Sequence, residues 1–325
     1  MPFFKRPQPL ASILVGLGIA YGVLAAPAKA NITFNATFGS SITTDAHAAD
    51  IIATINQAIN FYEANITNPI TVNITFNEMA TGLGQSSTFF NTVSYTEYLA
   101  ALMTHSSGDA VDTAALASLP VAATNPVNGD PNMDVTTANL RALGIAAVAA
   151  TDSTIGINTS ITNYTGVAFN PTFYSLLAVI EHEMDEALGT GSNLNSGSTT
   201  GPVRPEDLFR YNAPNGRSYT TSSSATSYLS FDSGTTNLIA FNQAGPPTKS
   251  DYSDWAGSGT PHVQDAFGTP GASPAFSIFE QDALDAIGYN FVPVPEPSTL
   301  GLLGLGAVLA FWIHTSALKR VVRGR

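Results

Sequence analysis

The chain contains no cysteine among its 325 residues. Disulfide bridges, thiolate nucleophiles and cysteine-ligated metal centres are therefore excluded. Any bound metal has to be held by histidine, aspartate or glutamate side chains. That donor set favours zinc or a harder divalent cation over copper(I) or an iron–sulfur cluster.

Basic residues are also few, and most of them lie near the two ends of the chain. Residues 31–295 hold five of the 12 Lys and Arg residues but 23 of the 24 Asp and Glu residues, a formal charge of −18. Nucleic acids and anionic membrane surfaces attract basic proteins, so this balance argues against both as partners. It is typical of a soluble, cation-binding extracellular protein.

Residues 1–30 have the three parts of a secretory signal peptide. Lys5 and Arg6 form the positive start, residues 10–24 the apolar run, and residues 28–30 (AKA) a small-x-small cleavage site. A transmembrane anchor is the alternative, but the apolar run is short and the cleavage site is well formed. The sequence therefore predicts export.

The other end of the chain, residues 294–325, resembles a PEP-CTERM sorting signal. A Pro-Glu-Pro motif in residues 294–299 is followed by an apolar stretch at 300–313 and a basic tail ending at Arg325. The basic tail places everything before residue 300 outside the cytoplasm. A plain single-span anchor is the alternative, which so short a run supports less well. The resemblance implies processing by an exosortase in a Gram-negative bacterium, with membrane contact only through this segment and delivery to the outer surface or beyond.

The centre of the chain holds the strongest helical pattern, at residues 173–190. Its apolar residues recur at helical spacing, which predicts one largely buried helix. Gly189 and Gly191 end it, since glycine readily adopts the left-handed conformation found at helix ends. The apolar residues of this pattern are Leu176, Leu177, Val179, Ile180, Met184, Ala187 and Leu188.

Three chemically active side chains lie within this helix. His182 and Glu186 are four residues apart, so they share a face and can hold one cation together. Glu183 lies about 100° around the helix from His182, within reach of a water on that cation. The alternative is an acidic helix patch with a capping or core histidine. Four carboxylates on one apolar helix would then repel one another, which favours the cation.

The rest of the chain mixes predicted helices and strands with no internal repeat. This order predicts one α+β domain over residues 31–293 with an inserted β-hairpin region. The loop at 251–271 carries Trp255, His262 and Phe267, and such loops are more often functional than core. Helices are predicted at 50–64, 95–102, 110–119, 136–143 and 276–289, strands at 31–38, 70–76, 154–158 and 166–170, hairpins within 218–243, and loops at 125–134 and 192–201.

Most of residues 32–291 resembles a PEP-CTERM-associated metalloprotease family whose members carry HExxE. Residues 182–189 (HEMDEALG) are similar to the metzincin motif HExxHxxG, with Glu186 in place of the second histidine. The ending FEQDALDAIGYN resembles the last helix of that clan, and the stretches DLFRY, GRSYT, SDW and DAF also fit the family. The resemblance implies a metzincin-like zincin domain with a mixed sheet and an active-site helix. It also implies a zinc-dependent endopeptidase acting on proteins or peptides.

The third metal ligand departs from the common pattern. The usual position falls at Ser192, a poor zinc ligand. In leishmanolysin-like members the ligand is a histidine just before a tryptophan, after a long insertion, and Asp254 holds that place before Trp255. The resemblance thus implies His182, Glu186 and Asp254 as ligands, with a methionine-turn equivalent near Phe267. His262 and Asp207 are the other candidates, and an ordinary turn or capping aspartate is the alternative for Asp254.

In this interpretation Glu183 is the general base that activates a water molecule for attack on a peptide carbonyl. One histidine and two carboxylates nearly neutralise a dication, which predicts slow turnover, a higher pH optimum or a metal harder than zinc. A non-catalytic extracellular matrix or surface protein with a structural cation, such as calcium, is the alternative. A carbohydrate hydrolase is disfavoured because Glu183 and Glu186 lie on one helix, not on opposed walls. Arg210 is expected to pair with a carboxylate or a backbone carbonyl.

Overall fold

The computed structural model describes residues 31–244, 251–257 and 259–292. The predicted signal peptide (1–30) and the sorting segment (294–325) lie outside the described residues. None of the helices that are described combines the length and the apolar character needed to cross a membrane.

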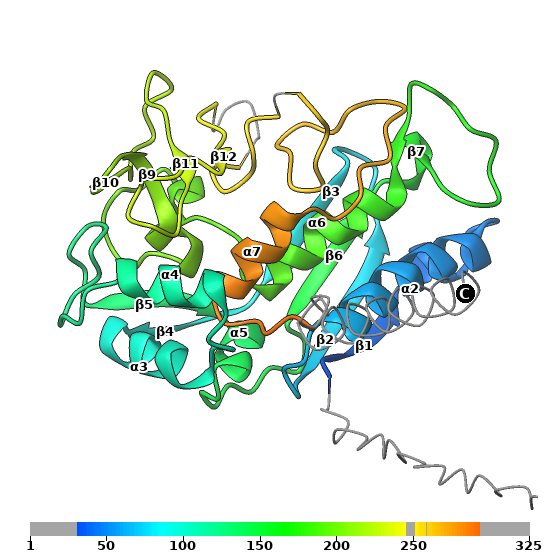
Figure 1. Cartoon of the computed structure of the whole chain (residues 1–325). Helices are drawn as coiled ribbons and strands as arrows, with labels where there is room; N and C mark the ends of the chain where they lie inside the picture. The colour runs from blue at the N-terminus through cyan, green and yellow to red at the C-terminus, as the bar shows by residue number, and fades with distance from the viewer. Residues whose placement is uncertain (1–30, 245–250, 258, 293–325) are drawn as a thin grey trace, which may run out of the picture.

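A mixed four-stranded sheet forms the centre of the fold (Figure 1). Strands β1 (Thr33–Phe38), β2 (Thr71–Glu78) and β6 (Ser153–Ile157) run parallel, and β3 (Gly84–Thr88) pairs antiparallel with β6 at the edge. The strands predicted at 31–38, 70–76 and 154–158 are confirmed. The sequence did not predict β3, because GQSST is polar and lacks apolar alternation.

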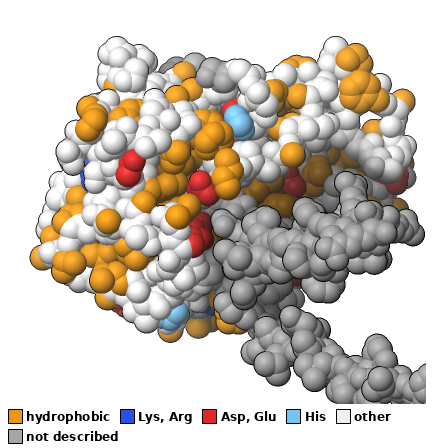
Figure 2. All heavy atoms as spheres, viewed as in Figure 1, with side chains coloured by type: hydrophobic (Ala, Val, Ile, Leu, Met, Phe, Trp, Pro, Cys, Tyr) orange, Lys and Arg blue, Asp and Glu red, His pale blue; other side chains and the backbone are white. Residues whose placement is uncertain are grey.

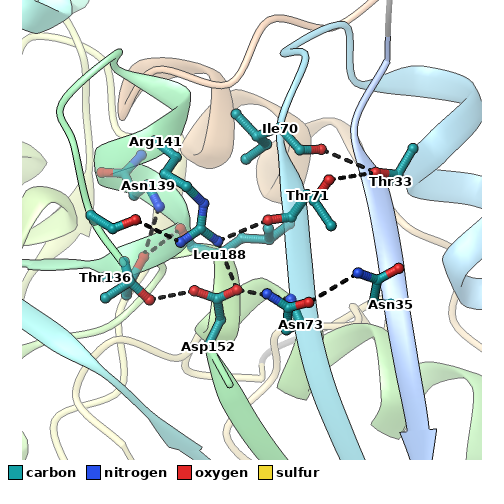
Figure 3. A network of polar contacts seen from close by, with 12 residues as sticks. Thr33, Asn35, Ile70, Thr71, Asn73, Thr136, Asn139, Arg141, Asp152 and Leu188 are labelled. Atoms are coloured by element: carbon teal, nitrogen blue, oxygen red, sulfur yellow. Dashed lines mark hydrogen bonds and ion pairs between the residues drawn. The ribbon is translucent and has the colours of Figure 1, made fainter. Parts of the chain in front are cut away.

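Two long helices cover one face of this sheet, α2 (Ala48–Asn65) and α6 (Leu176–Leu188) (Figure 1). Val72, Ile74 and Phe76 alternate along β2 and are buried. The intervening residues are polar and pair across strands: Thr33 and Thr71 hydroxyls lie 3.1 Å apart, and the Asn35 side chain donates to that of Asn73 (Figure 3). One face of the sheet is therefore apolar and covered, and the other is polar.

The helix predicted at 173–190 is confirmed over Leu176–Leu188 with Gly189 at its end, but it begins later than predicted because Tyr174 and Ser175 form a short strand. The Ser175 hydroxyl caps its start by accepting from the Ala178 amide, and Gly189 ends it with φ of 138°. Most of its apolar residues, among them Leu176, Ile180 and Met184, are buried in a core that runs from Ile32 to Phe291. Burying each such large side chain contributes about 1.5–3 kcal/mol. The helix is thus held rigidly against the sheet.

The other described elements surround this core (Figure 1). The helices predicted at 50–64, 95–102, 110–119, 136–143 and 276–289 are all confirmed, as is a hairpin within 218–243. The remaining helices are α1 (Ser40–Thr43), α3 (Tyr95–His105), α4 (Ala110–Ser118), α5 (Thr137–Ala142) and α7 (Ile278–Ala286), with 3-10 turns at Thr159–Ile161, Asn193–Ser196 and Pro205–Phe209. Two smaller sheets have two strands each: β4 (Phe90–Ser94) pairs with β5 (Asn132–Thr136), and β7 (Thr162–Asn163) pairs with β8 (Tyr174–Ser175). A further four-stranded sheet has the order β10-β9-β11-β12. Its strands are β9 (Arg210–Ala213), β10 (Gly216–Arg217), β11 (Tyr228–Leu229) and β12 (Ile239–Ala240).

Two local predictions are wrong. Residues 166–170 form a loop, not a strand, because the Asn163 side chain bonds the backbone of Asn170 and Phe173 and replaces strand pairing there. Strand β5 begins inside the predicted loop 125–134, where β4 provides an antiparallel partner that the local sequence does not reveal. The α+β class is confirmed, and the metzincin-like fold stays a prediction.

A buried ion pair joins the sheet to α5 (Figure 3). Asp152 is 0% exposed and accepts from Arg141 Nη2 at 2.7 Å, from the Asn73 amide at 2.8 Å and from Thr137 Oγ1 at 2.5 Å. Arg141 also donates to the Thr71 carbonyl. The carboxylate and guanidinium therefore connect strand β2 to helix α5 without leaving either charge unpaired.

Candidate metal centre

Helical spacing and the loop before Trp255 bring the three predicted ligands together. His182 Nε2 lies 3.9 Å from Glu186 Oε1 and 3.8 Å from Asp254 Oδ1. One ligand atom from each residue lies within 4.8 Å of the others. Two of these side chains come from α6, and Asp254 comes from a segment about 70 residues later, so the cluster depends on the tertiary fold.

The orientation of His182 is set by a backbone carbonyl. Its Nδ1 lies 3.0 Å from the oxygen of Val263. A carbonyl oxygen only accepts hydrogen bonds, so Nδ1 carries a proton and Nε2 faces the two carboxylates. A carbonyl that accepts from the other ring nitrogen of a histidine in this way fixes the tautomer that can ligate a metal.

Asp254 is held in place by buried neighbours on both sides. The Arg210 guanidinium donates to the carbonyls of Tyr252 and Asn242 and stacks 4.4 Å from the Phe241 ring centre. On the other side, Trp255 is 0% exposed. The prediction that Arg210 binds a backbone carbonyl is confirmed. The expectation of a functional rather than core role is wrong for Trp255, whose indole fills the core.

Trp255 is also anchored by a polar contact. Its Nε1 donates to Glu280 Oε1 on α7 at 3.1 Å. A buried indole N–H needs such an acceptor, since an unpaired buried donor costs about 1–3 kcal/mol. The contact ties the segment that carries Asp254 to the last helix of the domain.

Glu183 lies beside the cluster and is 6% exposed. Burial, and then the neighbouring carboxyl of Glu186 and the charge of Asp254, raise the pKa of Glu183 well above its usual range. Its Oε2 has no hydrogen-bond partner among the described residues. The raised pKa makes this carboxyl group a stronger base than an exposed glutamate, and Oε2 is available to a molecule that enters the site.

Two contacts of Glu186 were missed by sequence reasoning. Ser86 Oγ on β3 donates to Glu186 Oε2 at 2.5 Å. Asp251 also faces this carboxyl, since burial and then Glu186 raise the pKa of Asp251 to about 7. Neither residue belongs to a motif, and only the pairing of β3 with β6 and the path of the 251–257 segment place them here.

The residues present fit a divalent cation. Asp254 Oδ1 is buried and has no hydrogen-bond partner among the described residues. An imidazole nitrogen and two carboxylates are a ligand set that zinc accepts, and additional carboxylates suit a harder ion. Without a cation, the carboxylates gathered here would repel one another in a site of low polarity.

The two other candidate ligands lie outside this cluster. His262 stacks edge-on against Phe279 with ring centres 5.3 Å apart. Asp207 accepts from Ser192 Oγ at 2.5 Å and from the Arg204 amide at 2.9 Å, which caps the turn at Pro205–Phe209. The group that contains His182, Glu186 and Asp254 includes neither of these two residues.

A cavity of about 890 Å³ opens over the cluster. Its walls include His182, Glu183 and Glu186 from α6, residues 82–86 at strand β3, and residues 265–269. The last segment is where a methionine-turn equivalent is expected, although it carries no methionine. The cavity is large enough for several residues of an extended chain and gives access to Glu183.

The comparisons with known proteins find a match at the end of the chain. A model of the PEP-CTERM protein-sorting motif matches residues 293–313. No curated protein and no solved structure matches the chain. The metalloprotease resemblance and the ligand assignment thus stay predictions. The sorting motif implies that the chain is an exported protein, anchored transiently through its C-terminus and recognised by an exosortase.

Proposed function

We propose that this exported protein is a metal-dependent endopeptidase. The observation that carries the proposal is the convergence of His182, Glu186 and Asp254 beside a buried carboxylate, Glu183, at an open cavity. Zinc is the expected ion, with another divalent cation as the alternative. The substrate class is a protein or peptide.

Each residue of the centre has a distinct role in this proposal. His182, Glu186 and Asp254 would hold the cation. When bound, it would supply Lewis acidity toward a carbonyl group and toward water. Glu183 accepts the proton of the attacking water through an oxygen that has no other partner and delivers it to the leaving amine nitrogen. Ser86 and the Val263 carbonyl hold Glu186 and His182 in position.

The surroundings of the centre support a protein substrate. Strand β3 is the edge strand of the sheet and lies beside α6 at the cavity. An edge strand has unpaired backbone groups that bind an extended peptide. The resemblance of residues 182–189 to HExxHxxG points in the same direction.

The test is elemental analysis and proteolysis of wild type, His182→Ala and Glu183→Gln on an unfolded protein substrate. We expect about one zinc in wild type and in Glu183→Gln, little in His182→Ala, and proteolysis in wild type alone. Loss of general-base function typically costs 10²–10⁴-fold in rate. Unchanged proteolysis in Glu183→Gln would contradict the mechanism, and unchanged metal in His182→Ala would contradict the ligand assignment.

A structural cation site in a non-catalytic surface protein is the second candidate. It is favoured by the number of carboxylates around the cluster, since Glu183, Asp251 and the two carboxylate ligands suit calcium better than zinc. Calcium does not need an imidazole ligand. Retention of stoichiometric calcium in His182→Ala, with no proteolysis by any variant, would establish this candidate instead.

A further inference from the structure

A second group of carboxylates lies where α4 meets α7. These two helices lie before and after α6 in the sequence. One oxygen from each of Asp109, Asp112 and Asp285 lies within 4.8 Å of the others. Asp109 caps the start of α4, Asp112 lies in its first turn, and Asp285 lies in the last turn of α7. The two helices are in direct contact.

The three carboxylates differ in the number of hydrogen bonds that they accept. Asp109 Oδ1 accepts from the Asp112 amide at 3.0 Å, and Asp112 Oδ2 accepts from Ser107 Oγ at 2.8 Å and from the Gly108 amide at 2.9 Å. Asp285 is only 3% exposed, and its Oδ1 has no hydrogen-bond partner among the described residues. A buried oxygen of this kind costs about 1–3 kcal/mol unless something binds it, and more when it is charged.

No nearby side chain supplies the missing positive charge. Among the residues that the structure describes, no Lys, Arg or His forms an ion pair with Asp109, Asp112 or Asp285. Asp282 adds a further carboxyl one turn before Asp285 on α7, and the charge of Asp109 acts on it. On the face shown in Figure 2, acidic side chains appear as a few separate patches, and Lys and Arg side chains are almost absent.

The position of Asp285 at the end of α7 adds to the cost of leaving its own charge unneutralised, whereas Asp109 and Asp112 lie at the start of α4, where carboxylates are favoured. The C-terminal end of a helix carries a partial negative charge, which disfavours carboxylates and favours cations. Asp282 and Asp285 both lie in the C-terminal half of α7. A cation at Asp285 would interact favourably with the end of α7 as well as with the three carboxylates.

We propose that Asp109, Asp112 and Asp285 bind a calcium ion that joins α4 to α7. All donors are oxygen atoms, with no nitrogen or sulfur, which is the chemistry of a hard cation. Asp109 is exposed, so the ion enters from solvent and water completes its coordination. The site is separate from the His182 centre and stabilises the domain whether or not that centre is catalytic.

The role follows from where α7 lies in the chain. Its Glu280 accepts from Trp255 beside Asp254, and the segment after it pairs Phe291 with Ile66 at the end of α2. An exported protein meets much higher calcium outside the cell than inside, and extracellular calcium modules bind with Kd of about 10⁻⁴–10⁻³ M. Calcium would therefore secure the C-terminal helix after export.

The experiment measures thermal unfolding of the chelated protein while calcium is added to 10 mM. It is done in a Glu186→Gln, Asp254→Asn background, which removes the carboxylate ligands of the other centre so that it does not contribute. We expect the Tm to rise by about 3–5 °C when calcium reaches ten times its Kd. Asp285→Asn should show no calcium-dependent rise, and in chelator it should unfold no earlier than its parent, since the substitution removes repulsion.

Two controls make the outcome decisive. Glu97→Gln removes an exposed carboxylate on α3 and should keep the full calcium effect. Calorimetric titration with calcium should find one site that disappears in Asp285→Asn. No rise in Tm, or an equal rise in parent and Asp285→Asn, would overturn the proposal and indicate that Asp109 and Asp285 share a proton.

Discussion

Ser86 illustrates how a residue outside every motif can control the candidate centre. Its hydroxyl donates to Glu186 Oε2 at 2.5 Å, while Glu186 Oε1 faces His182. This contact fixes the glutamate orientation, and the loss of such second-shell contacts typically lowers metal affinity 10–100-fold. We therefore expect Ser86→Ala to bind zinc at least about tenfold more weakly in a chelator competition titration.

The neighbouring Ser87 offers a matched control for that substitution. It is exposed and points to the opposite face of β3. Ser87→Ala should leave zinc affinity unchanged. Equal affinities of Ser86→Ala and wild type would show that Glu186 does not ligate the ion.

The raised pKa of Glu181 predicts that the stability of the folded protein depends on pH. Burial, and then the charge of Glu280, raise the pKa of Glu181 from 4.5 to about 7. Between these values the folded protein holds a proton that the unfolded chain has released. The stabilising contribution is therefore present at low pH and lost as the pH rises through about 7. Glu181→Gln should remove this loss.

The measurement is denaturant unfolding of wild type and Glu181→Gln from pH 5 to pH 8. Wild type should lose on the order of 2–3 kcal/mol more of its free energy of unfolding than the variant over this range. The exposed Glu97→Gln should follow wild type. Parallel curves for wild type and Glu181→Gln would mean that Glu181 is charged in the folded protein at pH 5.

At the scale of elements, the contact of β3 with α6 controls the position of Glu183. A Cβ on Gly84 would lie 2.3 Å from Glu183 Oε1 and 2.8 Å from Val179 Cγ1, and the φ of Gly84 is not in the left-handed region. Gly84→Ala must therefore displace the glutamate. We expect kcat to fall at least about tenfold with metal retained, and stability to fall by about 1–3 kcal/mol.

Ser87→Ala tests whether that effect is specific to Gly84. Ser87 lies on the same strand, is exposed and is outside the residues that line the cavity. This variant should have wild-type kcat and stability. A Gly84→Ala protein that kept full proteolysis would show that Glu183 does not act at this position as the base.

The same elements show what sequence could and could not reveal. Helix α6 was predictable because its apolar period and its terminal glycine agree, and β2 because ITVNITF alternates apolar and polar residues. Strand β3 was not, since GQSST becomes a strand only by pairing with β6. The approach of Asp254 to His182 was reached through a family resemblance, and Asp251 was missed because its placement depends entirely on tertiary packing.

At the scale of the whole molecule, the Arg141–Asp152 pair connects the sheet to α5 (Figure 3). Asp152 is fully buried, so removing its cation leaves an uncompensated charge. Breaking a buried pair in this way typically costs about 3–5 kcal/mol. We expect Arg141→Ala to lower the free energy of unfolding by about 3 kcal/mol in a denaturant titration.

Asp152→Asn and the double variant complete that cycle. Asp152→Asn in the Arg141→Ala background should recover part of the loss, because a neutral amide is less costly to bury than a charge. The two substitutions should thus be clearly non-additive. Additive losses would mean that the two side chains do not interact in the folded protein.

The high negative charge of the exported body favours cation binding at both candidate sites. Residues 31–295 have a formal charge of −18, and two clusters of ligating side chains lie within the described part of the chain, one with a histidine and one with carboxylates alone. Excess negative charge destabilises a compact state by self-repulsion. Bound cations at both clusters would relieve it, which links metal content to stability as well as to catalysis.

The central claim is that one divalent cation lies between His182, Glu186 and Asp254. The most direct test is an anomalous difference map, recorded at the zinc edge, from crystals of the protein grown with zinc. The account predicts a strong peak at bonding distance from His182 Nε2 and from carboxylate oxygens of Glu186 and Asp254, about 2.0–2.2 Å. A map without a peak there, in crystals that contain zinc elsewhere, would contradict it.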